Sequence, residues 1–221
     1  MAAAGVNRAS LGVQDFAANV QAAINRIQPY EMTAAAVAAL RRAGIDDLSF
    51  DLLYGLPGQT AASLVATVDQ ALELEPDRIS LFGYAHVPWM RKHQALMDES
   101  ALPGAAARLE LYQAAAGRLV ERGFSAIGID HFARPGDDLG KAGESGRLHR
   151  NFQGYTTDQA DILIGLGASA IGALPQGYVQ NAPQVPDYRR AIEAGRLATV
   201  RGLELNADDR LRRDVIERLM C

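Results

Sequence analysis

The chain has 221 residues, of which 48% are hydrophobic and 22% are charged, and its formal net charge is -4 at pH 7. This composition is typical of a globular protein with a sizeable core, and the acidic balance argues against general nucleic-acid binding, which needs a basic face. No apolar stretch approaches the roughly 20 residues of a membrane span. The first residues lack the basic and apolar regions of a signal peptide, so we expect a cytoplasmic protein.

The chain has one cysteine, Cys221, which is its last residue. A single thiol excludes a disulfide within the chain and any metal site built from several cysteines. We therefore expect no metal ligands in this chain. An anionic small molecule is a compatible ligand, because local arginines can bind carboxylates even where the average charge is acidic.

Strands and helices are expected to alternate through the first part of the chain. Short apolar runs predict strands over 9–14, 48–54, 78–84 and 124–129, and helical spacing predicts helices over 17–26, 33–43, 61–74 and 105–122. Thr60 is the expected N-cap of the third helix, and Gly44 and Gly123 follow the ends of two others. Such alternation with short connections predicts an α/β fold with parallel strands.

The pattern changes after Asp130. Residues 131–155 are polar and rich in glycine and arginine, 161–172 resemble a buried strand with a turn, and 185–194 and 207–220 have helical spacing. We therefore divide the chain into residues 1–135, the later part of a barrel-like domain, and 136–221, the rest of that domain with the start of a helical region.

Polar residues gather where the expected strands end, which is where ligands collect in parallel α/β folds. The strand ends carry Gln14-Asp15, Asp51, Tyr84-Ala85-His86 and Asp130-His131, with Arg134 just beyond. Asp51 favours a site, because a carboxylate inside a strand is costly to bury without partners. For His86 and His131 a structural hydrogen bond is the favoured interpretation over a site role, and Gln14 and Arg26 are ordinary polar residues on spacing alone.

Two glycine-rich segments and one arginine-rich loop carry weaker signals. Residues 55–58 lack the lysine and spacing of a phosphate-binding loop and indicate a sharp turn, and 165–172 lack the dinucleotide-binding spacing. Arg134, Arg147 and Arg150 lie in a polar stretch that is either a solvated surface loop or a functional loop.

Several segments together resemble one family: NRASLGVQDF (7–16), NR (25–26), DLLYGLPGQT (51–60), YAH (84–86), GIDHFARP (128–135), LHRNFQGYTT (148–157) and GLGASAIG (165–172). The chain resembles the oxygen-independent coproporphyrinogen III oxidases, which are radical S-adenosylmethionine enzymes. A haem chaperone-like branch of the same superfamily shares YGLPGQT but differs at the YAHVP, DHFARP and HRNFQGYTT segments, which favours the oxidase.

The resemblance implies a partial (β/α) barrel with a mainly helical C-terminal extension. It also implies two bound S-adenosylmethionine molecules and a 4Fe-4S cluster held by three cysteines. The implied reaction is oxidative decarboxylation of two propionates of coproporphyrinogen III to vinyl groups by a 5'-deoxyadenosyl radical, which gives protoporphyrinogen IX in haem biosynthesis. An electron donor, an electron acceptor and a monomeric state belong to the same expectation.

By the same resemblance, the expected contacts of the second S-adenosylmethionine are Gln14, Arg26, Asp51 and Ala85. Ile171 is the expected contact of the first. Arg134 and Arg150 are hypothesised to pair with the substrate's propionates, because carboxylates need cationic partners. No catalytic residue is assigned.

The chain departs from the family pattern because the cysteine triad is absent, and so are the glycine-rich segment and the acidic residue that help to hold the first S-adenosylmethionine. All of these are expected upstream of the first strand, and the family's C-terminal region is expected to continue past Cys221. We therefore expect a fragment that is inactive alone and that leaves a strand edge unpaired. The alternatives are a cluster-free module that binds a tetrapyrrole or nucleoside, and the product of a decayed gene.

Overall fold

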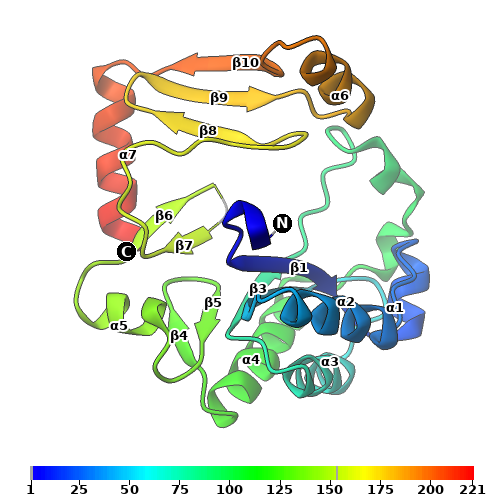
Figure 1. Cartoon of the computed structure of the whole chain (residues 1–221). Coiled ribbons are helices and arrows are strands. Elements are labelled where there is room, and N and C mark those ends of the chain that lie inside the picture. Colours follow the sequence, from blue (N-terminus) through cyan, green and yellow to red (C-terminus); the bar gives the residue numbers. More distant parts are fainter. Residues whose placement is uncertain (1, 153) are drawn as a thin grey trace. The chain divides into compact units, whose positions relative to one another are not determined.

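The computed structural model describes residues 2–152 and 154–221, so Gln153 of the 148–157 motif lies outside the described residues. The chain forms two compact units, residues 1–141 and 142–221 (Figure 1). Among the described helices, none combines the length and the apolar character needed to cross a bilayer.

The first unit is built on a five-stranded sheet with the order β1-β2-β3-β5-β4. Strands β1 (Arg8–Gln14), β2 (Asp47–Tyr54) and β3 (Arg78–Gly83) are parallel. Strand β5 (His131–Ala133) runs antiparallel to β3 and to β4 (Ser125–Ile127). Strand β1 forms one edge of this sheet.

The helices of this unit follow the sequence closely. They are α1 (Ala18–Ala23), α2 (Tyr30–Arg42), α3 (Ala61–Glu73) and α4 (Ala105–Glu121), with short 3-10 turns at Ala2–Ala4, Lys92–Leu96 and Glu99–Ala101. Thr60 caps α3 by accepting from the Ser63 backbone N–H, and the Ser63 hydroxyl accepts from Thr60 in return. Gly44, with φ of 80°, follows the end of α2. The expected cap and stop signals are therefore confirmed.

The helices α2, α3 and α4 cover one face of the sheet (Figure 1). The core joins alternate residues of the strands to these helices, and it includes Phe50, Leu52, Ile79 and Leu81, none more than 1% exposed. Side chains alternate between the two faces of a strand. The residues between these core positions therefore point to the opposite face.

The expectation of a fourth strand that adds directly to a parallel sheet is wrong. Strand β4 ends at Ile127, and the chain reverses through a turn at Gly128, where φ is 59°, into β5. This hairpin places β5 between β3 and β4. The apolar run over 124–129 gave no sign of the reversal, because a short buried run looks the same in either strand direction.

The second unit contains more strand than expected. A hairpin of β6 (His149–Asn151) and β7 (Gly154–Thr156) precedes an antiparallel sheet, β10-β9-β8, of Thr199–Glu204, Gly177–Asn181 and Ile171–Leu174. Helices α6 (Val185–Glu193) and α7 (Ala207–Met220) confirm the two expected helices, and α5 (Asp138–Glu144) spans the division between the units. The expectation of a mainly helical extension is wrong.

The segment 161–172 also differs from its expected structure. Strand β8 begins only at Ile171, and before it Leu163 forms an isolated bridge to Ala173. Leu166 is 85% exposed, so this apolar segment is not a buried strand. Apolar content alone does not distinguish a buried strand from a surface loop that carries glycine at the required turns.

Candidate functional site

A row of paired residues crosses the face of the first sheet that lies opposite the helices. Gly12 pairs with Asp51, Asp51 with Ser80, and Ser80 with His131, so the row spans β1, β2, β3 and β5. Residues paired in register point to the same face of a sheet. We call the surface formed by Ser10, Asp51, Ser80 and His131 the polar face.

The Asp51 carboxylate lies among hydroxyl groups on this face. The Ser10 hydroxyl lies 3.3 Å from both carboxylate oxygens and can donate to either. Burial raises the pKa of Asp51 above its ordinary value of 3.8, while hydrogen bonds from Ser80 and Ser10 and the charge of His131 act in the opposite direction. As a carboxylate, Asp51 is an acceptor suited to the hydroxyl or amino groups of a ligand.

The His131 ring is buried at the far end of the row, with 6% of its side chain exposed. Its Nδ1 lies 2.7 Å from Asp130 Oδ1, and its ring meets the ring of Phe82 edge to face with centroids 5.9 Å apart. These contacts place His131 on the polar face with a defined ring orientation. The sequence left its role open, and the structure makes it a member of the Asp51 row.

Strand β1 ends in a bulge that brings Gln14 and Arg26 to Gly12. The register shifts between Gly12 and Gln14, and Gln14 has φ of 68°, which is uncommon for a residue with a side chain. Arg26 donates to the Gly12 carbonyl at 2.7 Å. A Cβ at Gly12 would lie 2.8 Å from Gln14 Nε2 and 3.4 Å from an Arg26 nitrogen. Because Gly12 pairs with Asp51, the structure brings together three of the expected contact residues.

A buried hydrogen-bond network supports this strand end. Asp15, 1% exposed, accepts from the Ala17 N–H at 2.6 Å, the Thr67 hydroxyl at 3.0 Å and Gln59 Nε2 at 2.6 Å. Gln59 also donates to the Leu53 carbonyl at 2.8 Å. Sequence reasoning noted Asp15 as a polar residue at a strand end but missed Gln59, whose place in the GLPGQT turn was the available signal.

Ala85 follows the carboxyl end of β3. Its carbonyl accepts from Gln94 Nε2 at 3.1 Å, and Gln94 Oε1 accepts from the Val87 N–H at 2.6 Å. The Tyr84 N–H donates to the Tyr54 carbonyl at 2.8 Å, which holds this segment beside the end of β2. Ala85 therefore lies at the same edge of the sheet as Gln14. Gln94, which fixes its backbone, gave no signal in the sequence.

His86 links two polar side chains of the same segment. Its Nδ1 lies 3.2 Å from the Tyr84 hydroxyl, and its Nε2 lies 3.0 Å from Glu99 Oε1. These contacts support the structural interpretation of His86, as a residue that holds the irregular segment after β3 together.

Arg134 lies at the other end of the sheet. Because β5 is antiparallel to β3, Ala133 pairs with Arg78, and the Arg134 N–H donates to the Asp77 carbonyl at 3.0 Å, just before β3 begins. The expectation that Arg134 joins the carboxyl-end group is therefore wrong. The cause is the β4–β5 hairpin, which the sequence did not indicate and which carries the chain after Asp130 back toward the amino ends of the parallel strands.

The remaining two expected residues belong to the second unit. Ile171 begins β8 and pairs with Gln180, and a Cβ at Gly165 would lie 2.8 Å from the Ile171 carbonyl carbon, so only glycine permits this close approach. Arg150 lies on β6, with its guanidinium carbon 4.8 Å from the centre of the Tyr155 ring. Both are held by contacts within their own unit.

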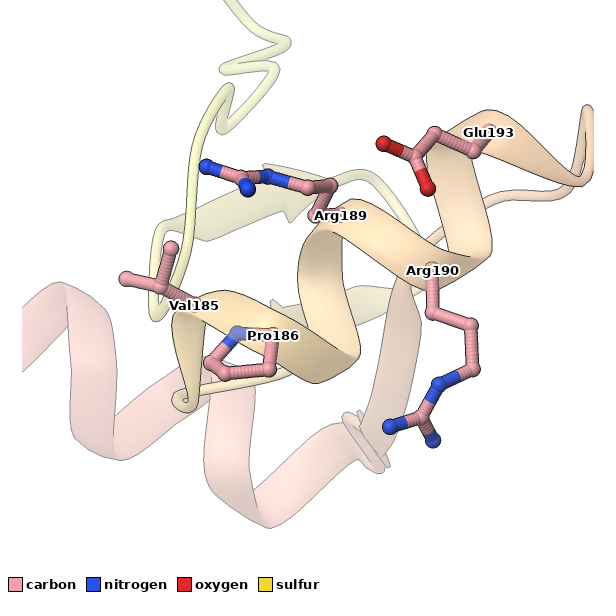
Figure 2. Close-up of a pocket in the computed structure, with 5 residues that line it drawn as sticks. All are labelled: Val185, Pro186, Arg189, Arg190 and Glu193. Atoms are coloured by element: carbon pink, nitrogen blue, oxygen red, sulfur yellow. The ribbon is translucent and has the colours of Figure 1, made fainter.

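A shallow surface pocket lies along α6 and is lined by Val185, Pro186, Arg189, Arg190 and Glu193 (Figure 2). All of these residues come from one helix, and Figure 2 shows Arg189 and Arg190 extending in different directions. None of the expected contact residues lines it. We therefore place the candidate site on the polar face and at the adjoining strand ends.

Comparison with known proteins shows what the chain is similar to. Residues 1–71 match the radical SAM superfamily. An oxygen-independent coproporphyrinogen III oxidase of Bradyrhizobium diazoefficiens is 58% identical over 221 residues, 100% of this chain and 49% of that protein. One of Pseudomonas aeruginosa is 46% identical over 217 residues, 98% of this chain and 47% of that protein. The solved coproporphyrinogen III oxidase of Escherichia coli, described as a radical SAM enzyme, matches with a TM-score of 0.85 and 42% identity over 100% of this chain and 51% of that chain.

Over its whole length the chain is similar to oxygen-independent coproporphyrinogen III oxidases. The resemblance and the α/β fold of a partial radical S-adenosylmethionine barrel, both expected from the sequence, are thereby confirmed. The chain spans about half the length of the curated relatives that it matches.

Radical S-adenosylmethionine proteins bind S-adenosylmethionine and a 4Fe-4S cluster, and the residues of this chain fit the first of these groups better than the second. Among the described residues, no group of three or more histidine, cysteine or acidic side chains could hold a metal ion, and Cys221 is exposed. Three cysteine ligands cannot come from one cysteine. The polar face does suit S-adenosylmethionine, because it offers a carboxylate for hydroxyl or amino groups beside the Arg26 guanidinium.

Proposed function

We propose that the chain is part of an oxygen-independent coproporphyrinogen III oxidase, which converts two propionates of coproporphyrinogen III to vinyl groups by oxidative decarboxylation and gives protoporphyrinogen IX. The 58% identity to the Bradyrhizobium oxidase and the TM-score of 0.85 to the Escherichia coli enzyme support this activity. Because this chain supplies no cluster ligand set, we expect it to be inactive unless the cluster is provided by another part of the protein. A cytoplasmic, monomeric enzyme with an electron donor and an electron acceptor completes the proposal.

The observation that carries the proposal is the convergence of Gln14, Arg26 and Asp51 on Gly12. We propose that these residues, with Ala85, bind a second S-adenosylmethionine. Asp51 accepts from hydroxyl or amino groups, Arg26 pairs with a carboxylate through donors other than the one used on Gly12, and Ala85 contributes backbone and an apolar wall. Ile171 is proposed to contact the first S-adenosylmethionine.

The substrate carries propionates, for which cationic partners are required. Arg150 is proposed for this role, and its place over the Tyr155 ring holds the guanidinium in a defined position. Arg134 was given the same role from its motif. Its place beside the amino end of β3 gives that assignment no support from the geometry.

A chimeric enzyme tests the activity. Residues 1–221 would replace the matching segment of the Escherichia coli oxidase, which the chain covers in full at 42% identity. We expect the chimera to convert coproporphyrinogen III anaerobically, and the chimera with Asp51→Ala to lose most of that activity. Asp46→Ala, at an exposed position just before β2, is the matched control. A folded chimera that holds its cluster and S-adenosylmethionine but leaves the substrate unchanged would contradict the proposal.

A second candidate function is ligand binding without oxidation, which the single cysteine favours for this chain alone. Equilibrium binding of S-adenosylmethionine to the 221-residue chain addresses it directly. Binding by the isolated chain together with an inactive chimera supports the binding module. An active chimera supports the oxidase.

A further inference from the structure

His131 is close to Asp51 in the sheet although the two residues are far apart in the sequence. Ser80 pairs with both of them, so the carboxylate and the imidazole lie on either side of one hydroxyl on the polar face. The sequence resemblance assigns Asp51 to a ligand and assigns nothing to His131. A buried imidazole in the same row as a ligand-binding carboxylate therefore needs its own explanation.

The orientation of the His131 ring is fixed from two sides. Asp130 Oδ1 lies 2.7 Å from Nδ1, and because a carboxylate accepts but does not donate, Nδ1 carries the proton. The Phe82 ring meets the imidazole at an interplanar angle of 78°. The ring is thus held in place before any ligand binds, which is the arrangement expected of a residue that supports a site.

The charge of His131 acts on Asp51. Burial favours the neutral carboxylic acid and raises the pKa of Asp51, whereas the Ser80 and Ser10 hydroxyls and the charge of His131 favour the carboxylate. His131 is the one charged side chain among these influences. The hydroxyls of Ser10 and Ser80 can also serve as acceptors, so the ring of His131, when protonated, is the group that specifically favours ionised Asp51.

We propose that His131 is a positioning residue, which keeps Asp51 ionised and ready to accept hydrogen bonds from the hydroxyl or amino groups of a nucleoside ligand. This inference rests on the proposed S-adenosylmethionine site. The groups around His131 include Asp51 and Ser80 along the row, Ile127 on β4, Asp130 at Nδ1, and Phe82 across the ring. His131 acts through Asp51 and needs no contact with the ligand.

The test uses the 221-residue chain and two variants that separate charge from shape. His131→Asn keeps a donor near the position of Nδ1, so it can still bond to Asp130, but it removes the positive charge. His149→Asn is the matched control, because His149 Nδ1 also lies 2.7 Å from a carboxylate oxygen, that of Glu217, in the second unit.

The first measurement needs no ligand. In protein labelled with ¹³C at the aspartate carboxyl carbons, the Asp51 signal is identified by its loss in Asp51→Asn, and its titration is followed by NMR. We expect His131→Asn to raise the pKa of Asp51 by about half a unit or more, and His149→Asn to leave it unchanged. An unchanged titration in His131→Asn overturns the inference.

The second measurement is the S-adenosylmethionine affinity from pH 5 to 8. We expect His131→Asn to weaken binding by up to about threefold at pH values where Asp51 is partly protonated, and to leave it unchanged where Asp51 is fully ionised in both proteins, because half a pKa unit corresponds to about that factor. A loss that is the same at every pH points to a structural role and overturns the inference. If His131→Asn shifts the Asp51 titration but the wild-type chain binds no S-adenosylmethionine, the electrostatic link is supported and the proposed function is contradicted.

Discussion

Gln59 Nε2 lies 2.6 Å from Asp15 Oδ2, and this hydrogen bond joins the turn after β2 to the loop after β1. The Gln59 Oε1 accepts from the Leu56 N–H at 2.9 Å, so the same side chain also shapes its own turn. Gln14 directly precedes Asp15. The network therefore fixes the backbone that carries Gln14 and the Gly12 carbonyl.

Asp15→Ala is expected to destabilise the chain by about 2–3 kcal/mol, because it leaves buried donors of Gln59 and Thr67 without their acceptor. Urea unfolding followed by circular dichroism measures the change. Asp46→Ala removes an aspartate at an exposed position and is expected to change the free energy of unfolding by less than about 0.5 kcal/mol. Equal effects of the two substitutions would show that the network does not stabilise the fold.

Asp51→Asn is expected to make unfolding less sensitive to pH. Burial raises the pKa of Asp51 in the folded chain above its ordinary value of 3.8, so the folded state binds more protons than the unfolded state between these two values. Below pH 3.8 the carboxyl is protonated in both states and does not change the free energy of unfolding. As the pH rises from 3.8 to the pKa of the folded state, ionisation of Asp51 lowers the free energy of unfolding, and above that pKa the loss is constant. Asparagine does not ionise, so Asp51→Asn does not show this loss.

The measurement is the difference in free energy of unfolding between Asp51→Asn and the wild type, taken at pH 4 and at pH 7. We expect the free energy of unfolding of Asp51→Asn, relative to that of the wild type, to be higher at pH 7 than at pH 4. Burial also raises the pKa of Asp15 and Asp47, but these groups are present in both proteins and cancel. A difference that is constant with pH, or that moves toward the wild type, contradicts the prediction.

The elements with strong local signals were predictable from the sequence. Helix α3 has a capping residue, an amphipathic pattern and a clear end, and the structure places it at Ala61–Glu73 against an expected 61–74. The parallel strands β1, β2 and β3 follow from apolar runs separated by helices. The carboxyl-end position of Gln14 and Ala85 follows in turn, because parallel strands share one direction.

Features that depend on strand pairing were not predictable. The β4–β5 hairpin is made of strands of three residues each, too short to show a period, and it moves Arg134 to the opposite end of the sheet. The Asp51–Ser80–His131 row depends on register, which no single strand specifies. His131 therefore remained one of two histidines at a strand end until the pairing was known.

Gly12→Ala is expected to weaken S-adenosylmethionine binding with little loss of stability. The added Cβ meets the ends of the Gln14 and Arg26 side chains, which are flexible and can move aside. Their movement displaces two of the side chains that are proposed to contact S-adenosylmethionine. We expect at least about a tenfold loss of affinity by calorimetry, the equivalent of one good charged hydrogen bond.

Gly117→Ala is the control for this substitution. Gly117 lies inside α4, nothing lies within 4 Å of its added Cβ, and alanine favours a helix, so stability should rise slightly and affinity should not change. If Gly12→Ala binds S-adenosylmethionine as well as Gly117→Ala does, Gln14 and Arg26 are not the contacts.

The roles of Arg150, which is proposed to bind the substrate's propionates, and of Arg134, which was assigned to them from its motif alone, can be separated in the chimeric enzyme. Arg134 is anchored beside the amino end of β3, away from the strand ends that carry Gln14 and Ala85, so Arg134→Ala should change KM for coproporphyrinogen III by less than about twofold. Arg150→Ala should raise KM about tenfold, because it removes a charged partner of a carboxylate. Arg150→Lys keeps the charge but loses the planar fork, and should recover part of the loss. If Arg150→Ala and Arg150→Lys reduce thermal stability equally and leave KM unchanged, the guanidinium serves the fold through Tyr155 and another cation binds the propionates.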